Sequence, residues 1–345
     1  MKKSLIALAV AGAVSVPAFA ATSNVDVYGK LHVSASLFDD QTDDTEDLQI
    51  SSNASRIGFK GSEDLGGGLA AIWQIETDIN VDEANGSWAS RNVFVGLKSD
   101  AMGTVMIGNY GTPLLLIGRN IDLFGETMAD SRNVTGVDSD TRGKNSVTYM
   151  SPSFSGLAFA AQYSNSMEAP IVDGGMGPSG NNGDFADDSF WSLNGTYTNG
   201  PLFVGLGYSA GDALEAVGVD KEWRVAAGYS FGNFKVVGQY DKSDGETSVD
   251  ADFDSWLLGA AYTMGNVVLK ANYMDGDVDG SSNDPKQWTI GADYNLSKRT
   301  TVYALYADGE YIAFGSGVGS TDQVGSCATC GGDVSVFSLG MIHTF

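Results

Sequence analysis

Four side chains in this sequence are of the kinds that most often carry enzyme chemistry: His32, His343, Cys327 and Cys330, the only histidines and cysteines present. A histidine works as a catalytic base only within hydrogen-bond reach of a nucleophile or a water. Strict alternation along the final segment places His343 on the same face as the apolar Phe345, whereas His32 has the opposite, polar-face parity. No H-E-x-x-H motif and no glycine-rich phosphate loop accompanies them. The sequence therefore argues against an enzyme.

The cysteine pair forms the sequence Cys327-Ala328-Thr329-Cys330. A redox-active C-x-x-C needs a helix N-terminus to lower the thiol pKa, but the glycines Gly325, Gly331 and Gly332 disfavour a helix here. In an oxidising compartment the favoured interpretation is a small structural disulfide. Two cysteines do not support a tetrahedral zinc site, so the sequence predicts neither a metal nor a cofactor.

Acidic residues dominate the charge of the chain. There are 43 acidic and 19 basic residues, a formal net charge of −24. Nucleic acid is excluded as a partner, because binding it requires a basic surface that displaces counterions. The densest acidic run, residues 39–47, carries oxygen ligands suited to Ca²⁺ but lacks the spacing of an EF-hand loop, so a solvated surface loop is the favoured interpretation.

The N-terminus has the three parts of a signal peptide. Lys2 and Lys3 are followed by an apolar run, residues 5–16, and then by Ala18-Phe19-Ala20, which fits the A-x-A cleavage pattern. The apolar run is too short to span a bilayer. The sequence predicts a signal peptide over residues 1–20 and one exported domain over residues 21–345.

Period-two alternation is the strongest structural pattern in the exported part. From Val25 to Leu37, apolar residues alternate with polar or charged ones. This pattern predicts a strand with one apolar and one polar face. No later segment reaches 18 consecutive apolar residues, so a membrane-embedded form of this chain must be a closed β-barrel, in which every backbone group is paired.

The regular spacing of four tyrosines indicates a repeat of β-hairpins. Tyr197, Tyr229, Tyr262 and Tyr294 are separated by 32, 33 and 32 residues, and each is followed by a short connector and a second strand. Several strands carry an aromatic residue at both ends of the apolar face, as in Trp256-Leu258-Ala260-Tyr262. Two aromatic belts around an apolar band are typical of membrane barrels.

The predicted fold class is all-β: a transmembrane, antiparallel, up-and-down β-barrel of about 16 strands, an even number as such barrels require. The expected strands cover residues 25–38, 49–61, 69–79, 88–99, 103–109, 145–151, 157–164, 188–198, 202–209, 221–230, 234–241, 254–263, 267–275, 286–296, 300–307 and 335–345.

The exported part resembles the Gram-negative general porins over its full length. The segments that carry the resemblance are residues 53–69, 91–98, 103–108, 146–152 and the terminal strand 339–345. The resemblance implies a water-filled homotrimeric barrel in the Gram-negative outer membrane, in contact with lipopolysaccharide and outer-membrane lipid. It also implies that the outer-membrane assembly machinery recognises the terminal strand through Phe345, and that the third loop, about residues 110–144, folds inward to narrow the pore.

In such porins the carboxylates of the third loop face a basic wall. The candidate loop residues are Asp122 and Glu126. The candidate wall residues are Arg56, Lys60, Arg91 and Lys98, with Lys30 as a further base on the first strand. Opposed charges across a narrow pore orient polar solutes and disfavour apolar ones.

The expected function is passive diffusion of small hydrophilic solutes and ions, with a weak preference for cations. Two alternatives remain: a substrate-selective channel, for example for oligosaccharides, or a structural or adhesive barrel without an open pore. Tyr28 and Tyr303 are the inward aromatics, too few for an aromatic slide. Small inward residues favour an open lumen because they leave space: Gly205, Gly207, Ser209, Ala226, Gly228, Gly259 and Gly291.

Overall fold

The structure is a computed structural model that describes residues 24–40, 45–135, 140–167, 189–216, 218–245, 252–312, 314 and 333–345. The predicted signal peptide over residues 1–20, the pair Cys327 and Cys330, and most of the acidic run 39–47 lie outside the described residues or side chains. Within the described part, no helix has the length and apolar character needed to cross a bilayer.

The strands, in chain order, are β1 (Asn24–Asp40), β2 (Thr45–Ser52), β3 (Arg56–Gly66), β4 (Leu69–Asp78), β5 (Val93–Ser99), β6 (Gly103–Gly111), β7 (Arg142–Met150), β8 (Leu157–Met167), β9 (Phe190–Asn199), β10 (Leu202–Ala210), β11 (Val219–Phe231), β12 (Phe234–Gly245), β13 (Phe253–Met264), β14 (Val267–Val278), β15 (Lys286–Asn295), β16 (Thr300–Glu310) and β17 (Asp333–Thr344). The helical segments are α2 (Pro113–Ile121), α3 (Asp212–Glu215) and the 3-10 turn η1 (Ser131–Asn133).

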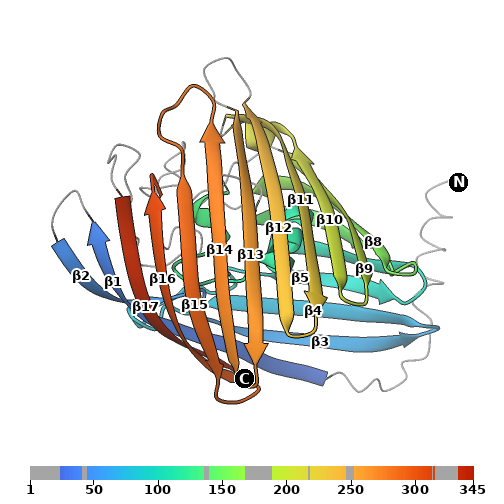
Figure 1. Ribbon diagram of the computed structural model, residues 1–345. Helices are drawn as coiled ribbons and strands as arrows, with labels where there is room; N and C mark the ends of the chain where they lie inside the picture. The colour runs from blue at the N-terminus through green and yellow to red at the C-terminus, as the bar shows by residue number, and fades with distance from the viewer. Residues whose placement is uncertain are drawn as a thin grey trace, which may run out of the picture.

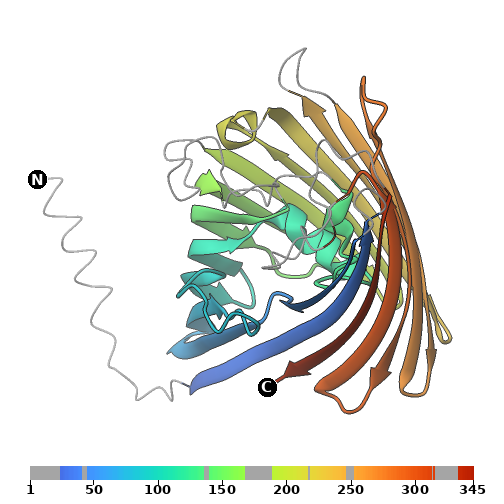
Figure 2. The same ribbon diagram turned by 90° about the vertical axis from the view of Figure 1, so that its left-hand side faces the viewer.

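All of these strands belong to one antiparallel sheet that closes on itself. β1 pairs with β17, with Leu37 opposite Phe337, so the first and last described strands lie side by side (Figures 1 and 2). β2 and β3 pair with successive parts of β1 and are two halves of one strand, which leaves a closed barrel of 16 strands. The predicted fold class is confirmed.

The single predicted strand 49–61 is interrupted because the chain changes direction at Ala54. Ala54 adopts a left-handed φ of +50°, which ends the ladder between β2 and β3. The predicted strand 88–99 likewise begins only at Val93, since the residues before it belong to the connection after β4. Alternation alone did not reveal the break at Ala54 or the later start at Val93. Neither place contains a proline, which would have marked the end of a strand.

Tight turns join the strands at one end of the barrel. Phe231 and Phe234 pair across a two-residue connection whose first member, Gly232, has a φ of +56°. Glycine at this position gives the turn a twist that matches the flanking strands. The same arrangement recurs at Gly265 between β13 and β14.

Burial alternates along the strands with apolar side chains on the outside. In β13, Leu257 is 1% exposed and points inward, while its neighbour Leu258 is 60% exposed. Aromatic pairs mark both ends of the outer surface: Tyr208 and Trp223 at 4.4 Å, Trp256 and Tyr273 at 5.2 Å, Trp288 and Tyr306 at 5.4 Å, Phe231 and Phe234 at 5.5 Å, and Phe234 and Tyr262 at 4.5 Å. An apolar band with aromatic borders is suited to a lipid bilayer.

Candidate functional site

The connection between β6 and β7 carries helix α2, which lies inside the ring of strands (Figure 2). The Thr112 hydroxyl caps the helix by accepting the N–H of Leu115 at 3.1 Å, and Pro113 begins the helix, where no N–H partner is needed. The helix contacts β9, β10 and β11. Ile117 and other buried residues of this connection form one apolar cluster with inward wall residues such as Ala226. The packing fixes the connection against one side of the wall.

Small wall residues receive this connection. A Cβ atom added to Gly205 would come within 2.9 Å of Ile117, and one added to Gly291 would come within 2.9 Å of Phe124. Both contacts are tighter than side chains tolerate, so glycine is required for the close approach. The interpretation of these small residues as open lumen was wrong at such positions, because the space they leave is filled by the connection itself.

Glu126 reaches from this connection to strands β1 and β3 of the wall. It lies in a turn in which the N–H of Thr127 donates to the carbonyl of Phe124 at 3.0 Å. Its carboxylate accepts a hydrogen bond from Arg56 Nη1 at 2.8 Å and also forms an ion pair with Lys30. The structure thus brings together three residues that the sequence nominated from distant segments: Glu126, Arg56 and Lys30.

The wall behind Arg56 continues as a network of alternating charges. Arg91 Nε lies 2.8 Å from one oxygen of Glu76, and its Nη1 lies 2.9 Å from Asp78. Arg56 Nε is 3.8 Å from the other oxygen of Glu76, and this same oxygen accepts the hydroxyl of Tyr28 at 2.9 Å. Arg91 therefore belongs to the same network as Arg56, although its direct partners are wall carboxylates.

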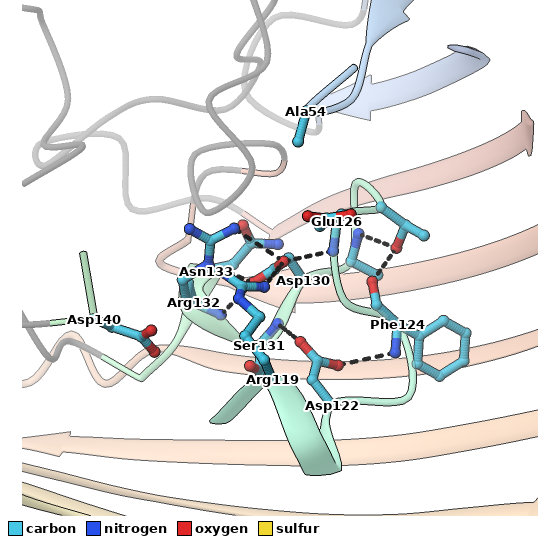
Figure 3. Close-up of polar contacts among 12 residues, drawn as sticks. Ala54, Arg119, Asp122, Phe124, Glu126, Asp130, Ser131, Arg132, Asn133 and Asp140 are labelled. Atoms are coloured by element: carbon cyan, nitrogen blue, oxygen red, sulfur yellow. Dashed lines mark hydrogen bonds and ion pairs between the residues drawn. The ribbon is translucent and has the colours of Figure 1, made fainter. Parts of the chain in front are cut away.

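Asp130 is the centre of a second network on the connection (Figure 3). Its fully buried carboxylate receives Arg119 Nη1 at 3.0 Å and Arg132 Nε at 2.9 Å, and it accepts the backbone N–H of Glu126 at 2.6 Å. Burial alone would raise the pKa of Asp130, but the two guanidinium groups outweigh it and hold that pKa below the ordinary value. Asp130 is ionised and bound by two arginines.

Asp122 is placed differently from the prediction. Its two carboxylate oxygens accept the backbone N–H groups of Phe124 at 2.8 Å and Ser131 at 2.9 Å (Figure 3). Burial, and then the nearby charge of Asp130, raise its pKa above the ordinary value. Asp122 thus holds the connection together, because a carboxylate that caps its own loop does not reach across to the basic wall.

Lys60 and Lys98 are not brought to Glu126. Lys60 is exposed, with its Nζ 5.0 Å from the centre of the Tyr28 ring, and Lys98 is exposed beside the β5–β6 turn, opposite Thr104. A strand rises about 3.3 Å per residue, so four residues along β3 already separate Lys60 from Arg56 by about 13 Å. Shared parity predicts which face of a strand a side chain lies on, but it does not predict the position of that side chain along the barrel axis.

Arg224 is a structural residue of the site that the sequence reasoning missed. It is fully buried on β11 and forms ion pairs with Asp140 at 2.7 Å and Asp241 at 2.6 Å. Asp140 belongs to the end of the connection, so this arginine ties the connection to the wall. Its parity, opposite to that of the outward Trp223 and Val225, was the available signal.

The two histidines have hydroxyl partners. The buried His32 Nε2 lies 2.9 Å from the hydroxyl of Tyr303, and His343 Nδ1 lies 2.9 Å from that of Thr300. Among the described residues, no group of three or more histidine, cysteine or acidic side chains is arranged to hold a metal ion.

Comparison with known proteins gives consistent matches over nearly the whole chain. A family model described as Gram-negative porin matches residues 7–311. The major outer membrane protein P.IB of Neisseria gonorrhoeae is 30% identical over 338 residues, covering 87% of this chain and 91% of that protein. The P.IB of Neisseria lactamica is 30% identical, covering 94% and 98%. The solved anion-selective porin from Comamonas acidovorans superposes with a TM-score of 0.74 at 25% identity, covering 94% of this chain and 100% of that one.

Proposed function

The chain belongs to the Gram-negative porin family, and from this premise we propose that it forms an outer-membrane pore for passive diffusion of small hydrophilic solutes and ions, with a weak preference for cations. The observation that carries the site assignment is the pairing of Glu126, on the connection between β6 and β7, with Lys30 and Arg56 of the facing wall. These charges would form the narrowest, most polar part of the path, which favours hydrated solutes over apolar ones.

The alternative functions have less support. A selective sugar channel would present aromatic faces along the lumen, but the inward Tyr28 and Tyr303 hydroxyls are engaged by Glu76 and His32. A structural barrel would fill its interior, whereas the polar inner face carries a connected array of ionised side chains that suits water. Diffusion through a hydrated lumen accounts for these charges more directly than adhesion does.

The proposed cation preference rests on a balance of charge at the site. Among the site residues described above, five are basic and five are acidic: Lys30, Arg56, Arg91, Arg119 and Arg132 against Glu76, Asp78, Asp122, Glu126 and Asp130. Because the basic and acidic residues of the site are equal in number, we expect the net negative charge of the rest of the chain to set the sign of the electrostatic potential in the pore. That field decays over about 8–10 Å in 0.1–0.15 M salt. The preference should therefore be weak and should fade as salt is added.

Reversal potentials across a potassium chloride gradient in planar bilayers test the proposal. The wild type should conduct and favour potassium weakly at low salt. Glu126→Gln should shift the reversal potential towards anions, and Arg56→Gln should shift it towards cations, because each removes one charge of the central pair. Absence of conductance would overturn the pore itself. Anion preference that strengthens as salt is lowered, the property named for the Comamonas porin, would overturn only the cation preference.

We also propose the remaining features that the resemblance implies: cleavage of the signal peptide after Ala20, homotrimer formation, contact with lipopolysaccharide, and recognition of Phe345 by the assembly machinery. The backbone N–H and carbonyl of Phe345 exchange hydrogen bonds with Gly29 at 3.1 and 3.0 Å, next to the β1–β17 seam. Deletion of Phe345 should reduce the amount of folded, heat-modifiable trimer in outer membranes. Wild-type amounts after the deletion would contradict the assembly role.

A further inference from the structure

Glu126 occupies a backbone conformation that glutamate rarely adopts. Its φ is +61°, in the third position of the turn from Phe124 to Thr127. A positive φ at this position of a turn is normally supplied by glycine or asparagine. A glutamate persists there only when surrounding contacts hold it, and such strain is common where a side chain must be aimed at a functional site.

Asp130 supplies the contact that holds this backbone. Its Oδ2 accepts the N–H of Glu126 at 2.6 Å (Figure 3). The Thr127 carbonyl in turn accepts the N–H of Asp130 at 3.1 Å, which fixes Asp130 beneath the turn. Asp130 is thus bonded to the turn at two points: its side chain accepts the N–H of Glu126, and its own backbone N–H donates to Thr127.

Asp130 also binds two cations of the same connection. Arg119 Nη1 lies 3.0 Å from Oδ2, while Arg132 donates its backbone N–H to Oδ1 at 3.0 Å and its Nε at 2.9 Å. Both guanidinium groups are engaged by Asp130, while the carboxylate of Glu126 pairs with Lys30 and Arg56 of the wall. Without Asp130, the nearest arginines on the same connection would compete for that carboxylate.

We propose that Asp130 is a positioning residue for the pore constriction, acting through Glu126. It fixes the left-handed turn that aims Glu126 at the wall, and it keeps Arg119 and Arg132 away from the Glu126 carboxylate. The inference rests on the proposed pore function and extends it to a residue that itself does not face Lys30 or Arg56. Asp130 therefore controls selectivity indirectly, by fixing where the charge of Glu126 lies.

A double-mutant cycle separates this role from the effect of the charge of Asp130 alone. The variants are Asp130→Asn, Glu126→Gln and the combination, with reversal potential and open-channel current noise as readouts. If Asp130 acts through Glu126, its substitution should shift the reversal potential and increase the noise in the wild type. In the Glu126→Gln background, Asp130→Asn should shift the reversal potential by less than about half of its shift in the wild type. The reason is that the effects of two interacting residues are not additive.

Two further variants sharpen the test. Asp130→Glu keeps the charge but moves the oxygens, so it should also increase the noise if position matters, whereas a pure charge effect would leave it like the wild type. Asp140→Asn is the matched control: it removes a carboxylate from the end of the same connection, where it pairs with Arg224 at 2.7 Å and lies outside the turn that carries Glu126. Its shift should add to that of Glu126→Gln.

The outcomes distinguish the inference from its premise. A wild type without conductance would overturn the pore, and the role of Asp130 with it. A conducting wild type in which the shifts of Asp130→Asn and Glu126→Gln simply add would overturn the positioning role and leave the pore intact. Heat-modifiable mobility of each variant checks folding. Should Asp130→Asn fail to fold, additivity of Asp130→Glu with Glu126→Gln decides the same question.

Discussion

Asp122 and Asp130 lie on the same connection and are both aspartates, but their pKa values are shifted in opposite directions. Burial and a neighbouring anion raise the pKa of Asp122, whereas two arginines lower the pKa of Asp130. The sequence nominated Glu126 and Arg56, because a long loop and strand parity are both visible in it, and the structure pairs them. It did not separate Asp122 from Glu126, since which carboxylate caps the loop and which one pairs with Lys30 and Arg56 depends on a single turn with a positive φ.

The lowered pKa of Asp130 predicts an acid transition. The stabilisation from its ion pairs is fully present above the ordinary aspartate pKa of about 3.9 and is lost as pH falls through the lower folded value. The part of the open-channel noise that depends on Asp130, measured as the difference from Asp130→Asn, should therefore stay constant from neutral pH down to about pH 4 and change below it. Asp130→Asn should lack this transition. The same acid transition in that variant would show that another group is responsible.

At the scale of elements, alternation identified nearly every strand, because side chains on the two faces of a barrel strand meet different solvents. It did not identify where α2 would lie. The wall glycines opposite α2 indicate space, but a sequence does not say whether water or protein fills that space. The break at Ala54 was equally invisible, since it depends on one backbone angle between two regular segments.

The glycines that receive α2 give a prediction at this scale. Gly205→Val should push Ile117 off the wall and weaken docking of the helix by about 1–3 kcal/mol, the usual cost of overpacking. Single-channel conductance should fall as the helix moves towards the lumen. The control is Gly238→Val on β12, where an added Cβ meets the outward Leu258 at an ordinary 3.4 Å. Equal effects of the two substitutions would argue against a specific seat for α2.

For the whole molecule, the outer apolar band predicts how position in the membrane sets the cost of a charge. Leu258 lies at the middle of β13 and Met264 at its end, and both are exposed on the outer face. Leu258→Arg should lower the free energy of unfolding by about 2–4 kcal/mol, and Met264→Arg by about 0–1 kcal/mol. Denaturant titrations in phospholipid vesicles measure both. Equal costs would contradict a membrane midplane near Leu258.

The seam between β1 and β17 has a consequence for how the chain reaches this shape. Ser36 and Ser338 hydrogen-bond across it at 2.8 Å although 302 positions separate them along the chain. A chain made from its N-terminus must carry β1 with one edge unpaired until β17 has been synthesised, and exposed strand edges invite pairing with other chains. Contacts this distant in sequence also form slowly. The barrel is therefore a product of the whole polypeptide, and the interval before closure is when it most needs protection from aggregation.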